Sequence, residues 1–385
     1  MNRKIPFHIP SIGEEEIAEL VDTLRNGWLT TGPKTKQFEK DFAAFVGAKH
    51  AVAVNSATSG LHLALEALGV RAGDEVIIPT YTFTATGEVV TYLGARPVLA
   101  DVRRDTFNLD ATTIEPLITP RTKAIIPVHV AGQMCDMDPI LELARRHDLR
   151  VLDDAAHTLP ATYKGRSVGT MGDASVFSFY ATKTITTGEG GMVTTDREDL
   201  ASRMRQMSLH GLSGNAWNRY GDKGSWYYEV LEFGFKYNMT DIAAALGIHQ
   251  LRRCDGFWKK RRDVASAYNA AFGALDTCVT PPLAEHTTHS WHLYILQLRL
   301  EALSKGRDEI LSILGERGIR TSVHFIPLHF HPAYQRAFGY TVGMFPVSEE
   351  IFAGTVSLPI YPDMKEEDVA YVIDTVRETL AESRR

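Results

Sequence analysis

The sequence predicts an α/β fold, in which a large domain with a mainly parallel β-sheet is followed by a smaller C-terminal α+β domain. Three observations support this prediction. Short apolar segments alternate with amphipathic ones between residues 50 and 195, as in successive β-α-β units. Segments such as AIIPVHV (124–130) are apolar throughout, which is typical of strands covered on both faces. The alternation stops after Thr240.

The elements of the large domain are expected in a regular order. In the first helix, Leu61, Leu65 and Leu68 recur at helical spacing. Helices are expected at 59–69, 84–94 and 138–147, and strands at 51–55, 75–79, 96–102, 124–130, 149–154, 174–180 and 191–195.

A long helical stretch, 241–275, begins the change to a different pattern of elements. The remaining segments mix strand and helix signals and indicate a small α+β domain. A chain of 385 residues is long for one core, so two domains are expected. We place the boundary near Arg252, which gives a large α/β domain at 1–252 and a small α+β domain at 253–385.

The composition argues against nucleic acid and membrane as partners. The formal net charge is −6, and the chain lacks the long basic run that binding to a phosphate backbone requires. No run approaches the roughly 20 apolar residues that cross a bilayer, and the first residues contain no apolar signal region. Three cysteines without a CxxC pair suggest a reducing compartment. A cytoplasmic protein is therefore expected.

Polar residues follow several of the predicted strands, at the sheet edge where open parallel sheets bind ligands. The stretch NSATSG (55–60) leads from a strand into a helix, and Thr58 and Ser59 could bind a phosphate beside the helix N-terminus. Serine and threonine at that place are also ordinary helix caps. Asp153 and Asp154 end another strand, where an acid could pair with a cationic ligand atom or cap the next turn.

Lys183 lies between an apolar strand, 174–180, and a glycine-rich turn. A lysine is usually a surface residue, but this amine, a strand-end carboxylate and a phosphate site together match pyridoxal phosphate. The amine would form an imine with the cofactor and the carboxylate would face its pyridine nitrogen. Phe83, after another strand end, would supply an aromatic face for the ring, although it could also be a core residue.

The chain resembles, from about Pro6 to Leu380, the DegT/DnrJ/StrS-type sugar-nucleotide aminotransferases, which have the fold-type I architecture of pyridoxal-phosphate enzymes. The resemblance is closest to the branch that aminates 4-keto sugars, such as the enzyme that makes 4-amino-4-deoxy-L-arabinose on a uridine diphosphate carrier. The matching stretches are GWLTTGP (27–33), SATSGLHLAL (56–65), GDEVIIPTYTF (73–83), DDAAH (153–157), FSFYATKTITTGEGGM (177–192) and FGFKYNMTDIAAALG (233–247).

The resemblance implies a transamination in which L-glutamate gives its amino group to the cofactor and leaves as 2-oxoglutarate. The amino group then passes to a keto group of a nucleotide-linked sugar, with C-4 as the expected position. Lys183 should hold the cofactor and act as the general base and acid. Asp154 should face the pyridine nitrogen, and His157, where many relatives have glutamine, should lie near the phenolic oxygen. Asp153 replaces the glutamate that is common before this acid.

The same resemblance implies a homodimer with shared active sites. Phe83 should stack on the cofactor ring, while Thr31 and His324 lie in segments that border the sugar pocket of relatives. The residues expected to bind the phosphate are Ala57, Thr58 and Ser178 of one subunit and Asn238 of the other.

The segment VHFIPLHFHPAY (323–334) contains three histidines, which could suggest a metal site. No nearby cysteine or acid in the sequence completes a set of ligands. We therefore expect His324, His329 and His331 to be pocket or core residues, and no metal.

Three other functions remain as alternatives. Sugar dehydratases of the same family have histidine in place of the lysine, so Lys183 argues against that activity. A dinucleotide-dependent dehydrogenase would need a G-x-G-x-x-G turn after the first strand, where NSATSG has one glycine. A non-catalytic regulatory protein of the same fold is the third alternative.

Overall fold

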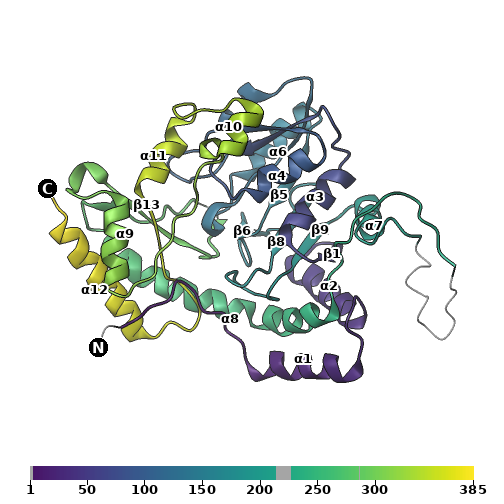
Figure 1. Ribbon diagram of the computed structural model, residues 1–385, viewed down its shortest axis with the longest axis horizontal. Helices are drawn as coiled ribbons and strands as arrows, with labels where there is room; N and C mark the ends of the chain where they lie inside the picture. Colours follow the sequence, from purple (N-terminus) through teal and green to yellow (C-terminus); the bar gives the residue numbers. More distant parts are fainter. Residues whose placement is uncertain (1–2, 214–226, 286) are drawn as a thin grey trace.

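A seven-stranded sheet forms the centre of the molecule in the computed structural model, which describes residues 3–213, 227–285 and 287–385 (Figure 1). The order of strands across the sheet is β1-β9-β8-β5-β4-β2-β3. Their bounds are β1 His50–Val54, β2 Glu75–Pro79, β3 Arg96–Ala100, β4 Thr122–Ile125, β5 Arg150–Asp154, β8 Ala174–Ser178 and β9 Gly191–Thr195.

Most neighbouring strands of this sheet run parallel, which confirms the predicted mainly parallel sheet. The pairs β2·β3, β2·β4, β4·β5 and β5·β8 are parallel. Strand β9 runs antiparallel to both β8 and β1. The connection from β8 to β9, residues 179–190, contains no helix, so the chain returns beside β8 instead of crossing over a face of the sheet.

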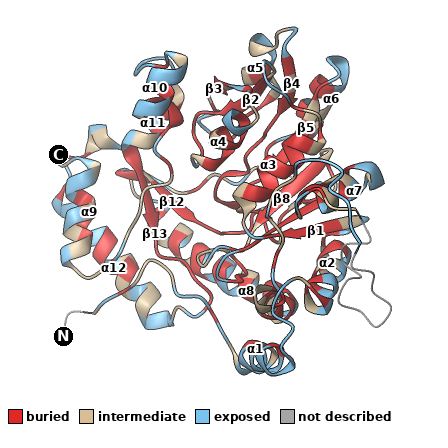
Figure 2. Ribbon diagram, turned by 45° about the vertical axis from the view of Figure 1, so that its right-hand side comes forward, coloured by how far each residue is buried: buried red, intermediate tan, exposed pale blue. Residues whose placement is uncertain are grey.

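The strands of the central sheet are mostly buried (Figure 2). Their side chains alternate between two cores, one on each face of the sheet. In β5, Val151 belongs to one core and Leu152 to the other. The first core includes residues of α2 (Pro33–Val46), α6 (Met137–Arg146) and α8 (Asp241–Phe272), and the second includes residues of α3 (Ala57–Ala67), α4 (Ala85–Tyr92) and α7 (Glu198–Met207).

A smaller antiparallel sheet, β10-β12-β13, forms the centre of the C-terminal part and has a third core of its own. A third sheet, β11-β6-β7, joins this part to the large one, since β6 and β7 precede β8 in the chain. The remaining elements are α1 Glu14–Asn26, α5 Ala111–Ile114, β6 Thr162–Tyr163, β7 Arg166–Ser167, β10 Cys278–Val279, β11 Thr287–Thr288, β12 Tyr294–Leu298, α9 Arg307–Glu316, α10 Pro332–Phe338, α11 Pro346–Gly354, β13 Thr355–Leu358 and α12 Glu366–Glu382, with short 3-10 turns at Glu115–Leu117, Val130–Gly132, Leu300–Ala302 and Leu328–Phe330.

Helix α8 runs along the molecule and belongs to both parts (Figure 1). Its side chains up to Phe257 pack in the first core, and those from Val264 onward pack in the third. The predicted boundary near Arg252 falls inside this continuous helix, and the division at that residue stays a proposal. The N-terminal segment also joins the C-terminal part, since Ile5 belongs to the third core and pairs with Ile319.

Within the described residues, none of the helices combines the length and the apolar character needed to span a membrane.

Candidate active site

A cavity of about 670 Å³ opens at the carboxyl ends of the central strands. Asp154 and Ser178 are the last residues of β5 and β8, and both line this cavity. Phe83 reaches it from the loop after β2. The structure thus brings eight of the predicted site residues to one place: Ala57, Thr58, Phe83, Asp154, His157, Ser178, Lys183 and His324.

Lys183 reaches the cavity from the helix-free connection between β8 and β9. Its backbone N–H donates to the Tyr180 carbonyl at 2.9 Å, which closes a tight turn. Burial lowers the pKa of the Lys183 amine to about 8, and the nearby charge of Asp154 opposes this shift only in part. Much of the amine is therefore neutral in weakly alkaline solution, as a nucleophile requires.

The adjacent acids Asp153 and Asp154 point to opposite faces of the sheet, because side chains alternate along a strand. Asp154 lines the cavity and accepts hydrogen bonds from Thr86 Oγ1 at 2.9 Å and from the Ala156 N–H at 3.2 Å. Burial raises its pKa. Asp153 lies away from the cavity and accepts from Ser175 Oγ at 2.8 Å, and burial raises its pKa to about 7. The inward acid is therefore Asp154, as the sequence indicated.

The N-terminus of α3 forms another part of the cavity wall through Ala57 and Thr58. Ser56 caps this helix, since its hydroxyl accepts from the Ser59 N–H at 3.1 Å. Strand β9 passes close behind, and a Cβ on Gly191 would lie 2.7 Å from the Ala57 nitrogen. Glycine is required for this approach, which places a positive helix end on the cavity.

Phe83 has 59% of its surface exposed although its loop lies between buried segments. The ring lines the cavity and lies 6.3 Å from the ring of Phe325, measured between centroids. Much of the Phe83 surface is therefore accessible to a ligand in the cavity.

His157, His292 and His324 are three of the four histidines that line the cavity together with Lys183. Burial lowers the pKa of all three, and that of His324 falls to about 4. The ring of His157 lies 4.5 Å from the ring of His292 and stacks on Phe325 at 5.6 Å. These imidazoles are therefore neutral near pH 7, so they can accept or donate a hydrogen bond without carrying charge.

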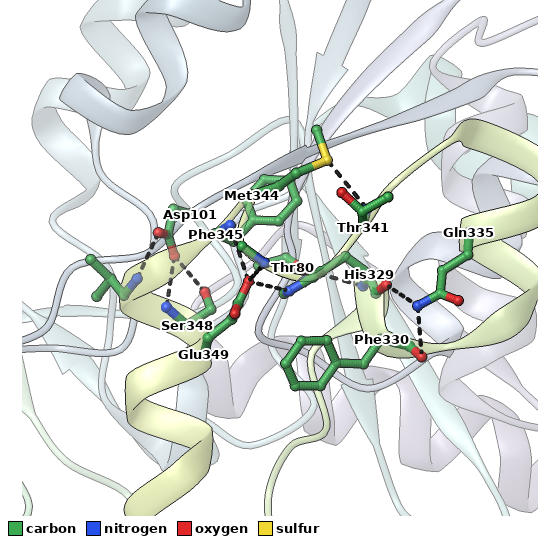
Figure 3. Close-up of polar contacts among 12 residues, drawn as sticks. Thr80, Asp101, His329, Phe330, Gln335, Thr341, Met344, Phe345, Ser348 and Glu349 are labelled. Atoms are coloured by element: carbon green, nitrogen blue, oxygen red, sulfur yellow. Dashed lines mark hydrogen bonds and ion pairs between the residues drawn. The ribbon is translucent and has the colours of Figure 1, made fainter.

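His329, in the same histidine-rich segment, does not line the cavity and belongs to a buried network of polar contacts (Figure 3). Its Nδ1 lies 2.7 Å from Thr80 Oγ1, and its Nε2 lies 3.0 Å from Glu349 Oε1. His331 lines the cavity. In the described part of the chain, no three histidine, cysteine or acidic side chains are grouped so that they could hold a metal ion.

Thr31 and Asn238 lie outside the cavity wall and contact each other. Asn238 Nδ2 donates to Thr31 Oγ1 at 2.6 Å, and Thr31 Oγ1 donates to the Met239 carbonyl. These two predicted residues therefore form a separate pair within one chain.

Comparison with known proteins places this site in a family. Residues 10–377 match the model of the DegT/DnrJ/EryC1/StrS aminotransferase family. The chain belongs to this family. It is 52% identical over 378 residues to the spore coat polysaccharide biosynthesis protein SpsC of Bacillus subtilis, a match that covers 98% of this chain and 97% of SpsC.

Solved structures of similar proteins agree with the family. Spr1654 from Streptococcus pneumoniae in its PLP form has a TM-score of 0.92 at 36% identity, covering 99% of each chain, and its PMP form is also known. Helicobacter pylori PseC, an aminotransferase involved in the biosynthesis of pseudoaminic acid, has a TM-score of 0.92 at 30% identity and covers 99% of this chain and 100% of that one. These matches confirm the predicted family, the fold-type I architecture, the aminotransferase class and pyridoxal phosphate as the cofactor.

The residues of the aminotransferase cavity fit this cofactor. An amine with a lowered pKa, a buried carboxyl group and a helix N-terminus are the groups that an aldehyde, a pyridine nitrogen and a phosphate require. His157 Nδ1 is buried without a hydrogen-bond partner among the described residues, so the wall also contains an unsatisfied hydrogen-bonding group.

Among the residues of the cavity wall that sequence reasoning missed are two polar ones, Thr86 and His292. Thr86 follows Phe83 by three residues at the start of α4, a place where a polar residue could have been suspected. His292 lies in no recognised motif and follows no strand end, and only the fold brings it to the cavity.

Proposed function

We propose that this aminotransferase moves the amino group of L-glutamate to a keto group, at C-4, of a nucleotide-linked sugar. The observation that supports transamination most directly is the buried Lys183 amine in one cavity with Asp154 and the N-terminus of α3. The choice of C-4, of the nucleotide carrier and of glutamate rests on the sequence resemblance.

The positions of the chain's own groups support the roles that we propose for them. The cofactor supplies an electron sink for the carbanion at the substrate carbon. Lys183 would hold the cofactor and would serve as the general base and acid for the proton at the substrate carbon. Asp154 would pair with the pyridine nitrogen, and the hydrogen bond from Thr86 orients its carboxyl group. Ser178, Thr58 and the α3 N-terminus bind the phosphate.

The composition of the cavity wall favours a sugar as the amino acceptor. Among the described residues that line it, Lys183 is the one lysine or arginine, and the others include hydroxyls and neutral imidazoles. Such groups match the hydroxyls of a sugar ring. The three cysteines are buried free thiols, which supports the cytoplasm as the proposed compartment.

The reaction is tested with purified holoenzyme, L-glutamate and a panel of 4-keto and 3-keto sugar nucleotides. We expect a 4-amino sugar nucleotide and an equal amount of 2-oxoglutarate, with Lys183→Ala as the inactive control. Amination of 3-keto sugars alone would contradict the C-4 assignment, and failure with every ketosugar would contradict the proposed function.

The active enzyme is proposed to be a homodimer, because the chain exposes an apolar patch beside the Thr31–Asn238 pair. Ile17, Val21 and Leu24 form one exposed stripe on α1, and Trp28 extends it toward Thr31 through a 3.1 Å hydrogen bond from Nε1 to the Thr31 carbonyl. An apolar stripe of this kind usually marks an interface. Covering it with a second copy would let each chain supply Asn238 to the cavity of its partner.

Hybrid dimers test the shared site. Lys183→Ala and Asn238→Asp homodimers should each be nearly inactive. In a hybrid of the two, one cavity collects both defects and the other collects neither, because a two-fold interface is isologous. Random reassortment makes about half of the dimers hybrid, so activity should recover to roughly a quarter of wild type. No recovery after verified subunit exchange would place Asn238 in the site of its own chain.

A further inference from the structure

His292 reaches the cavity on a short segment before β12, residues 289–292, which we call the strap. Trp258 Nε1 on α8 donates to the His289 carbonyl at 2.9 Å. On the other side, the Ser290 hydroxyl donates to the His157 carbonyl. The strap is therefore held between the long helix and the loop that follows β5.

Two residues have a positive φ at the strap: Gly132, which packs against Ser290, and Trp291 within the strap itself. Gly132 has φ of +103°, and a Cβ there would lie 1.8 Å from Ser290 Oγ. Trp291 has φ of +56°, which is uncommon for a residue other than glycine and is strained for a bulky one. Strain of this kind persists only where the surrounding contacts hold it, and it is concentrated at functional sites.

A buried charge helps to hold the strap. Arg261 on α8 is fully buried, and its Nη1 donates to the carbonyls of Trp291 at 3.3 Å and His292 at 3.2 Å. No carboxylate in the described part of the chain pairs with this guanidinium, and its Nε and Nη2 have no partner there. Burying an unpaired charge costs folding free energy. The fold therefore keeps the contact between Arg261 and the strap in spite of this cost.

The imidazole at the end of the strap has no hydrogen-bond partner among the described residues. His292 is buried and lines the cavity, yet neither ring nitrogen is hydrogen-bonded to any described residue, and Nδ1 is fully enclosed. Buried polar groups are normally satisfied. Because Nδ1 is enclosed, a molecule in the cavity can reach only Nε2, and the missing partner of Nε2 is expected among the molecules that enter the cavity.

We propose that His292 contacts the substrate and forms a hydrogen bond to a hydroxyl group of the sugar ring. This inference rests on the proposed sugar transamination and adds a specificity-determining residue to it.

A hydroxyl is the group that this environment suits. Burial, together with the charges of Lys183 and Arg261, lowers the pKa of His292 well below its ordinary value. A neutral imidazole adds no charge to bind the carboxylates of the amino donor. It can accept from, or donate to, a hydroxyl, which also does both. His292 should therefore serve the sugar and leave the amino donor unaffected.

The two half-reactions separate these substrates. Holoenzyme is mixed first with L-glutamate, and the aminated enzyme is then mixed with the ketosugar on which wild type is most active, while the absorbance of the bound cofactor is followed. In His292→Phe, the second-order rate constant with the ketosugar should fall by on the order of tenfold, the loss of one neutral hydrogen bond. The rate constant with glutamate should stay near wild type. His292→Gln, which keeps a donor and an acceptor, should recover much of the loss.

His129→Phe is the matched control, because His129 is also a buried histidine but does not line the cavity. It should change both half-reactions by a similar factor. Equal losses in both half-reactions of His292→Phe, no loss in either, or failure of both His292 variants to fold would each overturn the role in sugar binding. A wild-type enzyme that accepts no ketosugar would refute the proposed function and this inference with it, whereas a variant equal to an active wild type refutes the inference alone.

Discussion

Two neighbouring regions, the cavity wall and the network around His329, use buried histidines for different ends. His329 is satisfied on both ring nitrogens by Thr80 and Glu349 (Figure 3). The imidazoles of His157 and His292 lie in the cavity wall, and the Nδ1 atom of each is buried without a hydrogen-bond partner among the described residues. Burial lowers the pKa in both regions, so neither burial nor a shifted pKa distinguishes them. The difference is whether the protein itself completes the hydrogen bonds.

This contrast indicates that changes in the cavity wall should reduce activity with little effect on stability, and changes in the His329 network should do the opposite. In the cavity wall, a polar group whose partner is a ligand contributes little to the free energy of folding. In the His329 network, removing one buried partner leaves another group without its hydrogen bond, which lowers stability.

The largest effect is expected for Lys183→Ala. Turnover should fall by at least 10²–10⁴-fold, because the general base is removed, and the cofactor absorbance of the covalent form should disappear. The midpoint of urea unfolding, measured without cofactor, should not decrease, because the substitution removes an amine whose burial is unfavourable. Lys40→Ala, at an exposed position, is the control. An enzyme that kept a few per cent of its rate would contradict the role of Lys183.

Asp153, the buried acid outside the cavity, should make the free energy of unfolding depend on pH. Its pKa is raised to about 7 in the folded protein, so the folded state keeps a proton that the unfolded state releases. Stability is therefore lost as pH rises from about 4 to 7, by up to about 4 kcal/mol. Asp153→Asn should lack this loss, and urea unfolding at pH 5 and pH 8 measures it. If the stability of wild type and variant changed with pH to the same extent, Asp153 would already be ionised in the folded protein at low pH, contrary to this prediction.

Asp154→Asn sharpens the comparison between the two adjacent acids. Loss of the charge that faces the cofactor should lower kcat on the order of 10²-fold, with a much smaller effect on cofactor content. Asp153→Asn is the matched control and should stay near wild type in kcat. If the Asp153 variant proved the more damaged in kcat, the assignment of the inward acid would be wrong.

Glu349→Ala examines the core network and should show the smallest effect. It removes the acceptor for His329 Nε2 and for the Gly343 N–H at 2.6 Å, which should cost about 1–3 kcal/mol in the free energy of unfolding. The neighbouring Glu350→Ala breaks an exposed ion pair with Arg104 and should cost less than about 1 kcal/mol. A Glu349 variant with normal stability and a low kcat would erase the distinction between the two regions.

Much of the catalytic part of the site could be predicted because it lies where strands end. Asp154 and Ser178 are the last residues of β5 and β8, and Phe83 and the start of α3 follow β2 and β1 within a few residues. The carboxyl ends of parallel strands lie at one edge of the sheet. Residues that follow such strands in the sequence are therefore expected to lie close together in the structure. Lys183 was found in the same way.

The reversed strand β9 and the position of the N-terminal segment were not predictable from these patterns. Apolar periodicity indicates that residues 191–195 form a strand, but strand direction depends on which neighbour it pairs with. Ile5 joins the third core through Ile319, more than 300 residues away in the chain. Nothing local in IPFHIP indicates that contact.

The sequence by itself determined the alternation of elements, the sheet buried on both faces and the positions of Lys183 and Asp154 after strands, because these depend on periodicity and on short motifs. Only the tertiary structure decided which histidine is satisfied and which is open to a ligand. His329 finds Thr80 and Glu349 from distant segments, while His292 is brought to the cavity by contacts with α8. Hydrogen-bond partners of buried groups come from the whole fold, so their presence or absence cannot be read from neighbouring residues.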